Sequence, residues 1–321
     1  MSAYGHLGHI HVNEQGSFGL IHTDSLEAVP VITEGLAETI EQLVEENMRG
    51  RHAPGPTHEG IRSSQGPIRL QPMPDALGIF LRAACGQGSV AVQDSANVHK
   101  FFPLVTSDWS EKSPFPPLTA VVHRNVSSAD AYGDMVVNGL SLEIAHSQLL
   151  AMGVDFIGGQ HTNVAPTTPT FPAGLPWAWN QGSLSFGGVG VEELRSMTIQ
   201  QTNNIEAIYT VANSKTPQRI KRNNYPEITA TATICIAPAV HSYFDSLFQS
   251  QAESQVILNF NGVSSPGNLK IDIPQGRITA YAPQLGGPGA IEADITIMAK
   301  FDETSNYLAE YTLTNCRLSY P

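Results

Sequence analysis

The sequence predicts a mainly β protein with two tandem β-barrel or sandwich domains, each carrying a short flanking α-helix. Its 321 residues exceed the usual size of one hydrophobic core, which indicates about two domains. Its 28 Gly and 22 Pro, with only 14% charged residues, are typical of many strands and turns. A block that recurs in both halves of the chain gives the same domain count.

The recurring block reads as a short alternating strand, then a proline, then a compact amphipathic helix. It occupies residues 65–86 and 229–250. Pro74 and Pro238 lie 164 residues apart, and so do Phe80 and Phe244. A proline suits the first turn of a helix, where its missing N–H would have no partner in any case. The constant spacing predicts a tandem duplication.

Residues 1–30 read as an N-terminal arm with one strand at residues 9–12. The next segment, residues 31–48, has a helical period, and Thr33 could cap such a helix. However, Ile40-Glu41 matches Ile205-Glu206, which lies in a stretch rich in Thr, Ile, Tyr and Val. We therefore predict strands in both copies.

Long polar loops follow these strands, at residues 45–64 and 212–227. Unstructured loops of such length are usually functional in compact domains. Strand pairs close the two copies at residues 135–158 and 275–301. The predicted organisation is an arm (1–30), a first β-domain (31–160) with an insertion at about 87–128, a Pro- and Gly-rich linker (161–183) and a second β-domain (184–321).

The formal charge of −12 argues against a protein that grips a nucleic-acid backbone, because neutralising phosphates requires Lys and Arg. It is compatible with a surface past which DNA slides. The three scattered cysteines predict reduced thiols in a chain made in a cytoplasm. We expect no membrane anchor, because the sequence has no apolar run of about 20 residues.

The motifs VPVITEG, EENMRGRH, GPTHEGIRSSQGPIRLQPMPDALGIFL, MVVNGLSLEI and GVDFIGG resemble the tail tube (major tail) proteins of long-tailed, siphovirus-type bacteriophages. The resemblance implies rings that stack into a hollow tube around the tape measure protein and later pass phage DNA. Related tubes are built from hexameric rings of single-barrel subunits. A duplicated chain would supply the same six barrels from three chains, as a trimeric, pseudo-hexameric ring.

In that reading the long loops are inter-ring contacts. Their candidate contact residues are Met48, Arg49, Arg51, His52, His58, Glu59, Arg62, Lys215, Arg219, Lys221 and Arg222. Glu292 and Asp294 alternate with apolar residues and are candidates for an acidic lumen that repels phosphates. An outer solvated face is the competing interpretation. The implied partners also include the tail terminator and distal tail proteins, with the virion tail as location and the host cytoplasm as the site of assembly.

Other chemistry finds little support in the sequence. His6, His9 and His11 have metal-like spacing, but no carboxylate with matching geometry follows, so no metal or other cofactor is expected. No Gly-x-Ser-x-Gly elbow or phosphate loop occurs, and we predict neither catalytic residues nor an enzyme. The alternatives are another virion β-protein, such as a capsid decoration or tail terminator protein, and a soluble carbohydrate-binding module.

Overall fold

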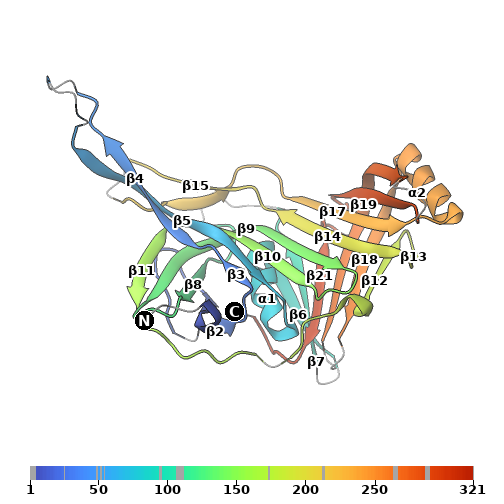
Figure 1. The fold of residues 1–321 in the computed structure, drawn as a ribbon, viewed down its shortest axis with the longest axis horizontal. Helices are drawn as coiled ribbons and strands as arrows, with labels where there is room; N and C mark the ends of the chain where they lie inside the picture. Colours follow the sequence, from blue (N-terminus) through green and yellow to red (C-terminus); the bar gives the residue numbers. More distant parts are fainter. Residues whose placement is uncertain are drawn as a thin grey trace.

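The computed structural model describes residues 5–24, 26–47, 50, 53, 55–93, 96–105, 112–172, 174–211, 214–262, 267–285 and 290–320. Within them the chain is mainly β, with two α-helices (Figure 1). The first elements are β1 His9–Glu14, β2 Glu27–Val29, β3 Thr33–Glu34, β4 Ala37–Val44, β5 Thr57–Leu70, α1 Pro74–Cys85, β6 Gly86–Gln93, β7 Ala96–Pro103, β8 Leu118–His123, β9 Ala129–Ala145, β10 Ala151–Gly158 and β11 Gln160–Val164. The rest are β12 Gly182–Phe186, β13 Val189–Val191, β14 Leu194–Thr202, β15 Ile205–Ile208, β16 Arg219–Arg222, β17 Glu227–Cys235, α2 Pro238–Ser250, β18 Glu253–Asn261, β19 Asn268–Gln284, β20 Glu292–Lys300 and β21 Glu310–Asn315; two 3-10 helices, Gly5–Leu7 and Trp179–Gln181, are also present.

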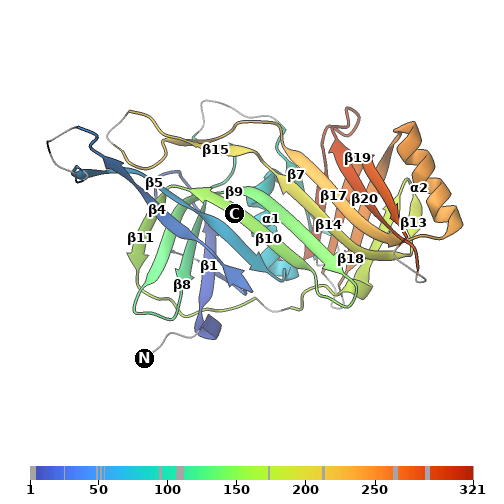
Figure 2. The same ribbon diagram turned by 45° about the horizontal axis from the view of Figure 1, so that its top comes forward.

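One antiparallel layer runs the length of the molecule. Its strands lie in the order β4, β5, β10, β9, β14, β17, β20 and β19, with β3 beside the start of β4. Alternation is clear in β17 and β20, where every second residue is buried and those between are more exposed, as in a sheet with one face on the core. The two ends of this layer lie at opposite ends of the molecule (Figure 2).

The long strands β9 and β19 connect this layer to the strands beneath it. The first residues of β9 pair with β11 on one side and β8 on the other, and β1 and β2 continue from β8. The first residues of β19 pair with β18 and β21, which continue into β12 and β13 and into β7 and β6, respectively. The fold is therefore sandwich-like, and the predicted mainly β class with flanking helices is confirmed.

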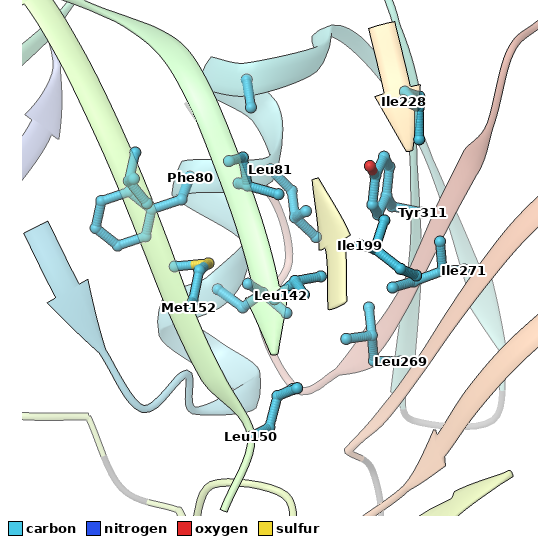
Figure 3. Packing of buried hydrophobic residues seen from close by; sticks show 14 of the residues in the cluster. Phe80, Leu81, Leu142, Leu150, Met152, Ile199, Ile228, Leu269, Ile271 and Tyr311 are labelled. Carbon is cyan, nitrogen blue, oxygen red and sulfur yellow. The ribbon is translucent and has the colours of Figure 1, made fainter. Parts of the chain in front are cut away.

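The two helices begin at the prolines that the sequence indicated. Pro74 and Pro238 are the first residues of α1 and α2. Gly86 ends α1 in the left-handed conformation, with φ of 80°. Between the layers, Phe80 and Leu81 of α1 pack with residues of β9, β10, β14, β19 and β21 into one apolar core that spans both halves of the chain (Figure 3).

The two halves of the chain share a strand register. In the β9–β10 pair a bulge leaves Asn138 without a partner, and in the β19–β20 pair the bulge leaves out Thr279. These residues are 141 apart, and so are Val154 and Ile295 in the neighbouring strands. The partners of Val154 and Ile295 in the next strand are Ile68 and Ala232, which keep the 164-residue spacing of the prolines.

Two sequence expectations need correction. Residues 45–64 are not one open loop, because β5 begins at Thr57 and pairs with β4 in an extended hairpin. The second loop likewise contains β16, which pairs with β15. The strands predicted around Ile40 and Ile205 are confirmed as β4 and β15. Strands β6 and β7 of the insertion pair with β21 at the end of the chain.

Replacing Gly66 by alanine should lower the free energy of unfolding by about 2–3 kcal/mol. Gly66 has φ of +149°, and an added Cβ would lie 2.1 Å from the Gly35 carbonyl oxygen, where the β3–β4 turn lies beside β5. Gly190→Ala is the matched control, because a Cβ there meets nothing within 4 Å. Urea unfolding of both variants measures the difference, and equal stabilities would contradict the steric argument.

Candidate assembly surface

The two halves of the chain are joined by a pair of neighbouring strands, which we call the internal junction. Residues 139–145 of β9 pair with residues 196–202 of β14, which joins the first half of the sheet to the second without a break. Asn203 N donates to Asn138 O at 2.7 Å, and His146 N donates to Arg195 O at 2.9 Å. The opposing residues 138 and 203 thus form a hydrogen-bonded pair, and so do 146 and 195. Hydrogen-bonded and non-hydrogen-bonded pairs alternate along antiparallel strands, so Ser141 and Gln200 form a non-hydrogen-bonded pair, in which side chains lie closest.

The same junction contains a buried polar cluster. Asn203 Nδ2 donates to Ala84 O at 2.8 Å and to Val137 O at 2.9 Å, which links α1 to β9. Gln201 Nε2 donates to the same Ala84 oxygen, and Gln201 Oε1 accepts a hydrogen bond from Tyr311. Gln201 and Tyr311 are fully buried, so these bonds replace water at the centre of the molecule.

The two ends of the long layer carry strand edges that pair on one side only within the described residues. Residues 280–284 of β19 pair with β20, while β3 and β4 pair with β5. Unpaired edges of this kind can join another chain. Sequence reasoning missed them, although Pro283 was a signal, since proline within a strand is confined to edges, first positions and bulges.

At the other end of the long layer, side chains already satisfy part of the edge formed by β3 and β4. Gly35 N donates to Pro67 O on β5, so the polar groups of Leu36 point toward the outer edge. Leu36 O accepts hydrogen bonds from Arg124 Nη2 at 2.8 Å and from Tyr132 OH at 3.1 Å. The Glu34 carboxylate holds Arg124 in place and raises its pKa.

The helices differ in how far the chain covers them. Nine residues of α1 are buried, because β6, β7, β9 and β21 all pack against the helix. On α2 only Phe244 is buried, and the helix lies against β19 at one end of the molecule (Figure 1). Apolar residues of α2 such as Val240 and Leu247 are only partly buried.

Three of the predicted contact residues come together within one chain. Glu59 on β5 pairs with Arg62 and with Lys215, which lies between β15 and β16. The hydrogen bond from Lys215, and then that from Arg62, lowers the pKa of Glu59. Arg62 N also donates to Lys215 O at 2.8 Å. The loop of the β15–β16 hairpin is thus tied to β5 of the β4–β5 hairpin, while exposed His58 lies on β5 opposite Leu43.

The other predicted contact residues lie in different places. Lys221 is buried in β16. Arg222 covers the Phe115 ring at 5.1 Å and donates to Asn203 O, and burial lowers its pKa. Arg219 is exposed at the start of β16. Met48, Arg49, Arg51 and His52 lie outside the described residues.

The candidate lumen residues lie in β20, on the face of the long layer that is turned away from the core. Asp294 accepts hydrogen bonds from Thr233 Oγ1 at 2.8 Å and Gln284 Nε2 at 2.9 Å. Glu292 lies 3.7 Å from Arg195 Nε. An Arg69–Glu143 ion pair lies on the same face in the first half. The residues are therefore on an open face, and their position in a lumen stays a prediction.

The histidines with metal-like spacing are not arranged as ligands. His9 and His11 lie in β1 with ring centroids 5.0 Å apart, and His9 contacts Thr167 O. Burial lowers the pKa of His11. Among the described residues, no three His, Cys, Asp or Glu side chains are placed to hold a metal. Across the residues that the structure describes, no helix is both long and apolar enough to cross a membrane.

The chain is thus a mainly β protein with a sandwich-like fold, and within the described residues both ends of its long layer carry strand edges that are paired on one side only. Residues 7–299 match the family described as phage tail tube protein, and the chain belongs to that family. It is a structural protein of the phage virion tail. A comparison with curated proteins finds no match.

Proposed function

We propose that this protein polymerises as stacked rings of three chains into a phage tail tube, a conduit for the delivery of DNA into the host. Each chain contributes two equivalent β-domains, related by a tandem duplication, so that three chains give six. Tape measure protein fills the tube during assembly in the host cytoplasm, and the tail terminator and distal tail proteins bind its two ends.

The observation that carries the proposal is the β9–β14 junction together with the common register of the two halves. In the shared register, residues 280–284 of β19 correspond to residues 139–143 of β9. Ile68 and Ala232 are equivalent positions in the two halves. Ile68 pairs with Glu34, and Ala232 pairs with Met197, so residues 33–39 of β3 and β4 correspond to residues 196–202 of β14. A second copy of the junction between neighbouring chains therefore pairs β19 with β3 and β4.

The details of the two edges fit that pairing. The register places Pro283 opposite Leu36 of the next chain, at a position where the internal junction has a hydrogen-bonded pair. Proline has no N–H to donate, and Leu36 O already accepts from Arg124 and Tyr132 of its own chain. The missing donor therefore leaves no carbonyl unsatisfied.

The helices support the same repeat. Within the chain, α1 is covered by strands that include β21 of the second half. In a ring, the first half of the next chain would cover the exposed side of α2 in the same way. Head-to-tail contacts of one kind close into rings, and rings whose upper face binds the lower face of the next ring stack into tubes. Carboxylates on the open face of the long layer would then line the bore and repel DNA phosphates.

Electron microscopy of the purified, untagged chain tests the proposal. We expect stacked rings or tubes, and native mass spectrometry of the smallest closed species should give three copies. Isolated rings that never stack would favour a tail terminator protein, and a monomer at high concentration would contradict self-assembly. Binding of a carbohydrate without polymerisation would favour the binding-module alternative.

A further inference from the structure

An apolar groove lies at the end of β20 and the start of β17. It has a volume of about 480 Å³ and is open on one side. Its apolar lining includes Val105, Tyr225, Met298, Phe301 and Leu308. Tyr225 is 84% exposed and Phe301 is 37% exposed, which is a large apolar surface to leave in water.

The corresponding place in the first half is covered from within the chain. There the β15–β16 hairpin packs Ile205 and Ile220 against Val136 and Ile157, and both hairpin residues are buried. Pro217, between the two strands, lies so close to Gly159 that a Cβ on that glycine would be 2.4 Å from its ring. Tyr209 OH reaches Arg62 O at 3.2 Å. The second half thus extends its hairpin over the first.

The groove occupies equivalent positions in the second half. Met298 corresponds to Ile157, and Lys300 corresponds to Gly159, at the 141-residue spacing of the long strands. Pro226 corresponds to Arg62 at the 164-residue spacing of the preceding strands. Within the described residues, no second hairpin is left to cover these positions.

The hairpin of the first half has the matching properties. The β4–β5 hairpin corresponds in position to β15–β16 and projects from the end of the molecule farther from α2 (Figure 1). Ile40 aligns with Ile205, yet it is 43% exposed where Ile205 is 7% exposed. Val44, on the same face of β4 as Ile40, and Leu43 are also exposed. An exposed groove in the second half of the chain and an exposed apolar hairpin in the first half are thus both left uncovered.

We infer that the groove around Met298 and Phe301 receives the β4–β5 hairpin of the next copy of this chain in the ring. The inference rests on the proposed ring. The contact lies beside the pairing of β19 with β3 and β4 and joins the same two chains. The base of the β4–β5 hairpin would then make a lateral contact between two chains of the ring. The base of the β15–β16 hairpin makes the equivalent contact inside the chain.

Two cysteine variants test the contact directly. One chain carries Ile40→Cys and the other Met298→Cys, both with Cys316→Ser, because Cys316 is the exposed cysteine while Cys85 and Cys235 are buried. Neither chain can link to itself through this contact. Mixed, assembled and treated with a short bis-maleimide, they should give covalent dimers on a denaturing gel, and each chain alone should not.

Met298→Glu tests whether the groove contributes to assembly. A carboxylate in a covered apolar groove is unfavourable, so we expect assembly to need at least about tenfold more protein. Leu175→Glu places the same charge at a leucine that is 73% exposed outside the groove and should assemble normally. Circular dichroism and thermal unfolding verify that both variants fold. Met298→Leu keeps the groove apolar and should assemble like the wild-type chain.

The outcomes separate the two proposals. Wild-type rings that give no dimers, together with normal assembly of Met298→Glu, would overturn the groove contact and leave the ring in place. Covalent dimers with impaired assembly of Met298→Glu support both. If the wild-type chain forms no rings at all, the proposed function fails and the groove contact fails with it.

Discussion

Asn203→Leu is expected to lower the free energy of unfolding by about 3 kcal/mol or more, because several buried polar groups lose their partners together. The Asn203 amide donates to Ala84 O and Val137 O and accepts from Gln201 Nε2 at 3.1 Å. Leucine has similar volume but no polar atoms. Each unsatisfied buried group costs about 1–3 kcal/mol, and Gln201 provides Ala84 O with one remaining donor.

Gln200→Leu is the matched control, since Gln200 lies three residues away and is exposed. Its free energy of unfolding should change by less than about 0.5 kcal/mol. Guanidinium unfolding followed by tryptophan fluorescence measures both variants, because Trp177 is buried and its indole donates to Gly267 O. A loss below about 1 kcal/mol for Asn203→Leu would show that water or a rearranged Gln201 replaces the lost bonds.

The sequence was most informative where structure depends on neighbouring residues. The strand, proline and helix around Pro74 and Pro238 follow from alternation and from the chemistry of helix starts, and both are present. The strand at Ile40 was predictable only by comparison with Ile205, because its own period is helical. Internal repetition therefore corrected a wrong local signal.

Partners distant in sequence could not be predicted in this way. Lys221 and Arg222 were predicted as contact residues of a long loop, yet Lys221 is buried, and Arg222 is held by Phe115 and by Asn203. The pairing of β7 with β21 joins residues such as Phe101 and Tyr311, which are 210 positions apart, and alternation within a strand does not identify its partner. For the same reason the one-sided strand edges could not be recognised, since a strand paired on one side shows the same alternation as one paired on both.

A chain with Ala37→Cys, Ala282→Cys and Cys316→Ser is expected to form disulfide bonds between neighbouring chains. The proposed register places Ala37 and Ala282 opposite each other as Gln200 and Ser141 are in the internal junction. That position is a non-hydrogen-bonded pair, in which side chains are about 4.5–5.5 Å apart at Cβ, close enough for a disulfide after a small adjustment. Both alanines are exposed in the single chain.

Oxidised assemblies of this variant should run on a denaturing, non-reducing gel as covalent rings of three chains, with dimers as the incomplete product. A three-chain ring closes on itself, so larger species should be absent, whereas an open filament would give a continuing ladder. Replacing Ala282→Cys by Gln284→Cys shifts the cysteine by two residues, to a diagonal position about 7–8 Å away, and should greatly reduce cross-linking. A ladder that extends to six chains would disprove the three-chain ring, and cross-linking that favours Gln284 would disprove the register while leaving strand pairing intact.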